Sequence, residues 1–168
     1  MKTIGKGFTL VELVVVVMII GVITFITVPR MVSAVVALGK SNTGAERIAA
    51  AIRQCRTLAI SNAATNQDGF ELGMKNTVGG SYTKFEIAQV INGQTSTVVE
   101  SGTIPGTLVE SGPAKVTCTC TSPGSGTFRF GPLGNRTGGS GGLTVVGGGK
   151  TFAISVVTTT GMVKCTQQ

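Results

Sequence analysis

The N-terminal part of the chain carries one long apolar run. From Phe8 to Val28 the sequence reads FTLVELVVVVMIIGVITFITV, and Glu12 is its only charged residue. At ~1.5 Å per residue, a helix of this length spans about 32 Å, which matches the ~30 Å hydrocarbon core of a bilayer. The pattern predicts a transmembrane helix over residues 8–28, with a carboxylate near its start that needs a partner in lipid.

The apolar pattern changes after Val28 and becomes amphipathic. Spacings of four, three and four residues predict a helix with one buried stripe, formed by Ile48, Ile52, Cys55 and Ala59. We expect residues 29–66 to continue the first helix and to fade between Asn62 and Asn66. The glycines in residues 39–44 predict a local break within this part.

Beyond residue 67 the pattern switches to short strands separated by Gly, Pro, Asn and Ser. The expected strands are Gly69–Lys75, Thr83–Ile91, Thr97–Ser101, Ala114–Cys120, Thr127–Phe130, Leu143–Val146, Thr151–Val157 and Met162–Cys165. The stretch Gly134–Gly142 is expected to be a flexible loop. The predicted fold class is therefore α+β, with a long N-terminal helix packed on antiparallel sheets and a β-rich domain over residues 67–168.

A short basic leader, MKTIGKG, precedes the apolar run. Lys2 and Lys6 favour a cytoplasmic N-terminus, which places the domain after Val28 on the far side of the membrane. An ordinary secretory signal has a shorter apolar run and a small-residue cleavage site after it, and neither is present here.

The residues Gly7-Phe8-Thr9-Leu10-Val11-Glu12 resemble the processing site of type IV prepilins and type II secretion pseudopilins. The resemblance implies that a prepilin peptidase removes residues 1–7 after Gly7 and methylates Phe8. It also assigns Glu12 to the family's acidic position and Pro29 to its helix-kinking proline. When such helices pack together, Glu12 of one subunit faces the N-terminal amine at Phe8 of a neighbour, a pairing that is stronger in low dielectric.

The composition argues against catalysis. The chain has no His and no Trp, and 25 of its 168 residues are Gly. Ser-His-Asp chemistry requires a histidine, and the acids after Glu12 are scattered along the chain. We therefore expect no enzyme activity, no catalytic residues, no cofactor and no metal site.

Four cysteines fall in a domain that is expected to lie outside the cytoplasm, where disulfides persist. They are Cys55, Cys118, Cys120 and Cys165. Cys165 is a candidate to pair with Cys118 or Cys120 and so tie down the C-terminal strand, and Cys55 either pairs or serves as a small apolar residue on the helix. The connectivity stays open, because spacing alone does not determine it.

A second resemblance covers about 40 residues in the C-terminal half. The stretch from Phe128 to Arg136, a glycine-rich turn, and strands closing on Gly161 are similar to the GspH/FimT group of minor pilins and pseudopilins. Some FimT-like members bind DNA through Gly-Arg-x-Arg, where this chain has Gly161-Met162-Val163-Lys164. This departure argues against DNA binding, for which the remaining candidate contacts are Arg136, Lys150 and Lys164.

Together these patterns predict a minor pilin or pseudopilin, a structural subunit assembled through its N-terminal helix that supports protein secretion across the outer membrane. The net charge of +7 is modest and mostly scattered. The alternatives are a FimT-like DNA-binding minor pilin for natural transformation and a major pilin. The expected partners are other pilins or pseudopilins, the prepilin peptidase, an inner-membrane assembly platform and membrane lipid. The expected location is the inner membrane, crossed once, and then a filament.

Overall fold

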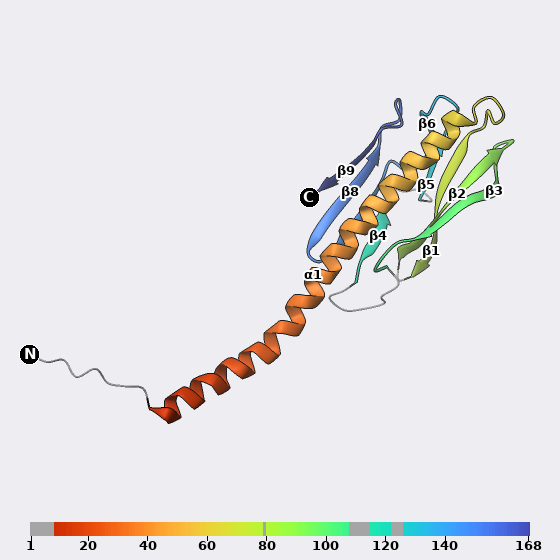
Figure 1. Ribbon diagram of the computed structural model, residues 1–168. Helices are drawn as coiled ribbons and strands as arrows, with labels where there is room; N and C mark the ends of the chain where they lie inside the picture. Colours follow the sequence, from red (N-terminus) through yellow and green to blue (C-terminus); the bar gives the residue numbers. More distant parts are fainter. Residues whose placement is uncertain (1–8, 79, 108–114, 122–125) are drawn as a thin grey trace, which may run out of the picture.

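A long helix, α1, runs from Leu10 to Ser61 and organises the molecule. The computed structural model describes residues 9–78, 80–107, 115–121 and 126–168. Asn62 ends the helix with a backbone N–H that donates to the Leu58 carbonyl at 3.0 Å. Figure 1 shows the N-terminal half of α1 projecting as a stalk from a β-rich body, which packs around the C-terminal half.

The described residues form nine strands in two antiparallel sheets. The five-stranded sheet has the order β3-β2-β1-β5-β6, and the four-stranded sheet has the order β4-β7-β8-β9. The strands are β1 Phe70–Val78, β2 Ser81–Ile91, β3 Gln94–Thr103, β4 Thr117–Cys120, β5 Thr127–Phe130, β6 Arg136–Gly139, β7 Gly142–Gly147, β8 Lys150–Val156 and β9 Val163–Gln167. This architecture confirms the predicted α+β class.

Each of the eight expected strands has a counterpart, and β6 is an additional strand. The predicted start of the fourth strand, Ala114, lies outside the described residues. The prediction of a flexible loop over Gly134–Gly142 is wrong, because Arg136–Gly139 pairs with β5. The glycines that suggested a loop are what allow the pairing. Gly139 has a φ of 91°, and a side chain there would bring its Cβ to 2.0 Å from the Thr127 carbonyl oxygen. Only glycine permits this backbone approach.

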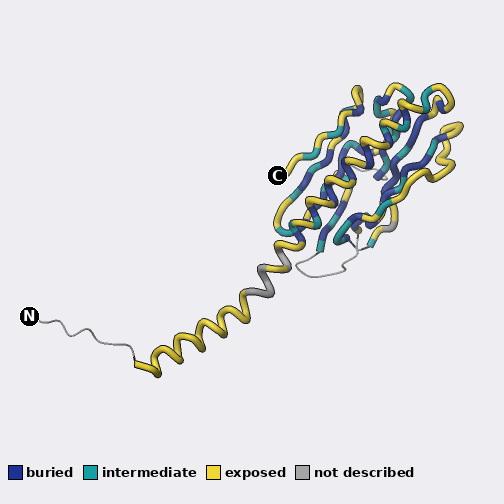
Figure 2. The backbone as a smooth tube through the Cα atoms, in the orientation of Figure 1, coloured by how far each residue is buried: buried dark blue, intermediate teal, exposed yellow. Residues whose placement is uncertain are grey.

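The core lies between the C-terminal half of α1 and the two sheets. The predicted helical stripe is confirmed, since Ile48, Ile52, Cys55 and Ala59 are all fully buried. The largest fully buried side chains facing it include Phe128, Phe130, Leu72, Ile87, Leu143 and Ile154. Figure 2 shows the buried residues confined to the body, with the described side chains of the stalk exposed.

The expected break at residues 39–44 is wrong, because α1 is continuous through them. Here the helix lies against the turn between β7 and β8. The buried Ser41 hydroxyl donates to the Gly147 carbonyl at 3.1 Å, and Gly44 lies against Ile104. Packing of this kind outweighs the ~1 kcal/mol helix penalty of a glycine.

The two sheets meet along two seams, which leave β3 and β9 at the outer edges. At one seam, the Ser81 hydroxyl in β2 accepts a hydrogen bond from the Cys118 N–H in β4 at 2.7 Å. At the other, the Arg136 N–H in β6 donates to the Thr158 carbonyl after β8 at 3.0 Å. Within the described part of the chain, the outer edges of β3 and β9 take no strand partner, and Figure 1 shows them on either side of α1.

Candidate functional site

The stalk of α1 is apolar and has no partner within the described residues. Among its large hydrophobic side chains, the exposed fraction runs from 45% at Val16 to 84% at Phe25. By length and composition, the 18 residues Leu10–Thr27 are long and apolar enough to cross a membrane. An apolar surface of this size is not stable in water, so it requires lipid or other apolar helices around it.

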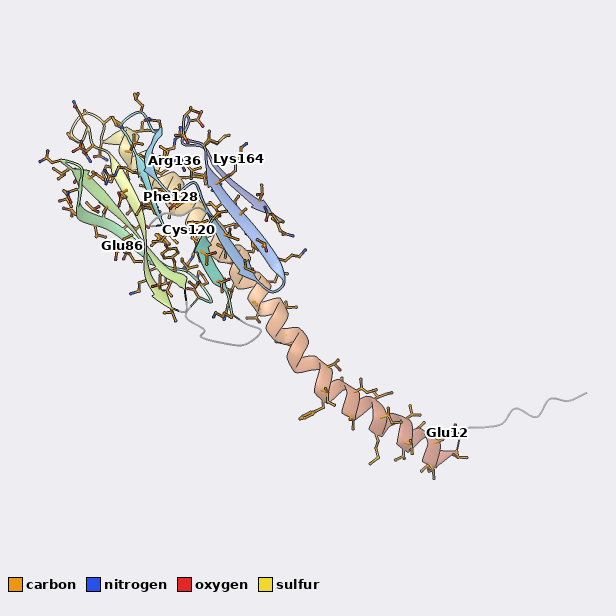
Figure 3. All side chains as sticks on the ribbon, turned by 180° about the vertical axis from the view of Figure 1, so that it is seen from behind. Glu12, Glu86, Cys120, Phe128, Arg136 and Lys164 are labelled. Carbon is orange, nitrogen blue, oxygen red and sulfur yellow. The ribbon has the colours of Figure 1, made fainter. Side chains whose placement is uncertain are left out.

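Glu12 lies in the first turn of α1, at the end of the stalk farthest from the body (Figure 3). Its backbone N–H donates to the hydroxyl of the N-cap residue Thr9 at 3.3 Å. Thr9 and Glu12 thus have the spacing of a capping box, and a carboxylate in the first turn is also favoured by the helix dipole. Sequence reasoning missed this local role, although the Thr-x-x-Glu spacing indicates it.

The other N-terminal predictions are not tested by the geometry. Gly7 and Phe8 lie outside the described residues. The backbone of α1 is helical through Pro29, and Figure 1 shows the helix axis changing direction between the stalk and the packed half. That Pro29 causes this bend stays a prediction, and a proline is the usual cause of one.

Two grooves flank the exposed face of α1 in the body. The first, which we call the β9 groove, has a volume of about 710 Å³ and lies between α1 and the β8–β9 edge. Its lining includes Asn42, Glu46 and Arg53 from α1, and Phe152, Cys165 and Gln167 from the sheet. The second, the β3 groove, is about 340 Å³ and lies between α1 and β3. There the Gln54 amide donates to the Glu100 carboxylate.

The four cysteines are free thiols. The pairing of Cys165 with Cys118 or Cys120 stays a prediction, and the strand order does not favour it, because β4 and β9 lie at opposite edges of their sheet. Three strand spacings of ~4.8 Å put them about 14 Å apart, whereas a disulfide needs Cα atoms within about 7 Å. Cys118 and Cys120 do lie on one face of β4, and the Cys120 thiol contacts the Tyr82 hydroxyl at 3.7 Å.

Burial makes two of these thiols inert. Desolvation, with a smaller contribution from Glu71, raises the pKa of Cys55 to about 12, and desolvation with Cys120 raises the pKa of Cys118 to about 12. Burial also raises the pKa of Cys165, with Glu46 adding to the shift and Arg53 opposing it. Because the thiolate is the reactive form, Cys55 and Cys118 should react only after unfolding.

The three candidate DNA contacts, Arg136, Lys150 and Lys164, are not brought together in one site, so a DNA-binding role gains no support from their placement. The Arg136 guanidinium forms hydrogen bonds within the domain, since it donates to the Ser140 carbonyl at 2.7 Å and to the Thr158 hydroxyl at 2.9 Å. Figure 3 shows that Arg136 and Lys164 lie toward the end of the body that is farther from Glu12. Lys150 is near the opposite end, where it shares a hollow with Val35. Lys164 lies opposite Ser155 in the β8–β9 pair. Ser155 is five residues along β8 from Lys150, so Lys150 and Lys164 are separated by about 17 Å along the strand direction.

The described residues hold no cluster of three or more His, Cys, Asp or Glu side chains that could bind a metal ion. The ionic interaction between Arg129 and Glu71, at 2.9 Å, joins β5 to β1 on the outer face of the sheet. Arg129 also donates to the Gly93 carbonyl at 3.3 Å and so holds the turn between β2 and β3. This cluster is structural, since each polar group in it has a partner within the domain.

Comparison with known proteins bears on the fold. No protein-family model matches this chain, and no curated protein sequence matches it. Two crystal structures of the Pseudomonas aeruginosa type IV minor pilin FimU are similar to it. In space group P65 the match has 15% identity, covers 74% of this chain and 91% of the FimU chain in that structure, and has a TM-score of 0.52. In space group P21 the match has 14% identity, covers 76% of this chain and 89% of the FimU chain in that structure, and has a TM-score of 0.55. The chain therefore has a type IV pilin-like fold, with a long N-terminal helix followed by antiparallel β-sheets.

Proposed function

We propose that this chain is a structural subunit of a type IV filament or a type II secretion pseudopilus. The observation that carries the proposal is the bare stalk of α1, an apolar helix with Glu12 in its first turn. A lone membrane anchor needs no acidic residue there. An acidic residue is useful in a helix that leaves the membrane and packs among similar helices, because there it can pair with a cationic group of a neighbouring subunit.

The processing motif supplies that partner. Cleavage after Gly7 by a prepilin peptidase leaves a positive, N-methylated amine at Phe8, four residues before Glu12. In a bundle of such helices, Glu12 of one subunit pairs with the Phe8 amine of its neighbour. Because both groups are removed from water, an unpaired Glu12 is strongly disfavoured, and the pair sets the axial register of the helices.

The remaining features agree with this role. Lys2 and Lys6 hold the leader in the cytoplasm, so the body lies beyond the inner membrane and an assembly platform extracts the processed subunit. The motifs favour a GspH/FimT-like minor subunit that supports protein secretion. The chain itself catalyses nothing, and the dispersed positions of Arg136, Lys150 and Lys164 do not favour a DNA-binding role.

Photo-cross-linking from the stalk tests the proposal. A photoreactive amino acid replaces each of Val14, Val15, Val16 and Val17 in turn, which samples more than one full turn of the helix. In intact cells, at least one position should join the full chain to the apolar helix of a pilin-like subunit, and peptide mass spectrometry identifies the neighbour. Adducts to lipid alone at all four positions would overturn the proposal and leave a simple membrane anchor.

A further inference from the structure

We propose that the free edges of β3 and β9 bind each other between two copies of the chain. The β9 edge of one copy takes the β3 edge of the next as an added strand. This inference rests on the proposed function, and it requires that copies of the chain, even as a minor subunit, stand side by side with their stalks in one membrane or at one place in a filament.

The backbone of β9 is prepared for such pairing. Gln168 donates to the Thr151 carbonyl at 2.8 Å, and Val157 donates to the Met162 carbonyl at 3.0 Å. Antiparallel strands alternate between hydrogen-bonded and non-bonded pairs, so these two bonds define which residues of β9 face β8. By that alternation, the N–H and C=O groups of Val163, Cys165 and Gln167 point toward the free edge.

The outer edge of β3 offers a matching set. Ile104 donates to the Thr83 carbonyl at 2.9 Å, and the register continues through Phe85 opposite Gly102 and Ile87 opposite Glu100. The same alternation leaves the backbone groups of Ser101 and Thr103 pointing outward. The bulge in this pair lies between Ile87 and Val90, so the part of β3 that approaches the stalk end is regular.

The two edges run in the same direction along the body. β3 starts at the turn where the Gly93 N–H donates to Asp68, just beyond the end of α1, and leads to Ile104 beside Gly44. β9 starts next to Gly161, which lies against Arg56, and its Gln167 lines the β9 groove with Asn42. Both strands therefore run toward the stalk, and copies anchored in the same orientation would pair them in parallel.

The charges at the two edges are complementary on the face toward α1. On the face toward α1, β3 carries Glu100, and the β9 groove carries Arg53, with Glu46 as its acidic residue. On the outer face, Glu86 lies opposite Ser101 and Lys84 lies opposite Thr103, so this face carries both signs of charge beside β3, and Lys164 projects from β9. Glu100 is the only charged residue of β3, so nothing on that strand repels the cations of β9.

A second copy is the occupant that these features favour. A long exposed edge strand is a site of aggregation unless something covers it, and β3 is exposed along nearly its whole length. An interface that joins one patch to a different patch on the next copy leaves a free patch on each end copy, so further copies can add. Such contacts give a ring when the rotation between copies closes and an open helical row when it does not, and a helical row is the geometry of a filament.

Engineered disulfides in the full chain test the pairing. In a chain carrying Cys120→Ser and Cys165→Ser, the substitutions Ser101→Cys and Thr166→Cys place thiols on the outer faces of β3 and β9. Mild oxidation of cell membranes should give a ladder of dimers, trimers and larger species on a non-reducing gel. A ladder requires both sites in every copy, so either substitution alone should give dimers at most.

A matched control uses the alternation of side chains along a strand. Ser101→Cys combined with the native Cys165 moves the second thiol one residue, to the opposite face of β9, and should lower the ladder at least fivefold. In the Ser101→Cys, Thr166→Cys chain, Glu100→Arg should weaken the ladder at least threefold, and adding Arg53→Glu should restore it.

The outcomes separate this inference from the proposed function. Stalk photo-cross-links to pilin-like helices without a disulfide ladder would overturn the edge pairing alone. Products whose masses are not multiples of the chain's own would assign the edges to another protein and also overturn it. Loss of both the stalk cross-links and the ladder would remove the proposed function together with the edge pairing.

Discussion

Replacing Glu12 with Gln is expected to reduce stalk cross-linking to neighbouring subunits at least tenfold while leaving the chain in the membrane. Breaking a buried ion pair by neutralising one partner costs about 3–5 kcal/mol, and ~1.4 kcal/mol is already a factor of ten. The apolar run is unchanged, so membrane insertion should not fall. The measurement is the yield of photo-cross-links from the stalk positions that are active in the native chain.

The choice of glutamine separates the two roles of Glu12. Glutamine is as suitable as glutamate at the third position of a capping box, so the Thr9 cap is preserved and only the charge is lost. Glu12→Asp keeps the charge on a shorter side chain and should retain part of the cross-linking. Normal cross-linking in the Glu12→Gln chain would mean that Glu12 serves helix capping and that subunit register is determined elsewhere.

Truncating Phe128 to Ala should destabilise the body by about 3–5 kcal/mol, a large part of the stability of a small domain. Phe128 is fully buried, stands opposite Leu72 in the β1–β5 pair, and has Gly139 as its other neighbour. Removing its ring leaves a cavity that these strands cannot close. In urea, this loss should lower the unfolding midpoint by more than ~1 M, given slopes of about 1–3 kcal/mol per M.

The readout for Phe128→Ala is the labelling of Cys55 and Cys118, which become reactive when the body unfolds. Leu133→Ala is the matched control, because Leu133 is 86% exposed and close in sequence. Its effect should stay within about 0.5 kcal/mol. Equal midpoints for the two variants would show that Phe128 does not support the core.

The sequence pattern predicted the parts of the fold that depend on local periodicity. The stripe from Ile48 to Ala59 and the alternation around Phe128 and Ile154 each identify which face of an element is buried. These signals are strong because a helix or strand must place its apolar side chains on one face. The end of α1 at Ser61 is also close to the expected fading at Asn62.

The features that the sequence did not show share a different cause, since each depends on contacts distant in sequence. Gly139 and Gly44 are read locally as flexible, yet the carbonyl of Thr127 and the side chain of Ile104 give them fixed surroundings. The separation of Cys165 from Cys118 follows from strand order, which spacing does not specify. The outer edges of β3 and β9, which have no strand partner in the described part of the chain, likewise emerge only once the two sheets are placed around α1.

The most direct test of the proposed subunit role is the mass of the N-terminal peptide from the chain purified out of membranes. A filament subunit should yield a peptide that starts at Phe8 and carries one added methyl group on its amine, the group that Glu12 of a neighbour would bind. A peptide that still starts at Met1, or a chain cut beyond Val28, would contradict that role, because neither product presents a Phe8 amine at the start of the stalk.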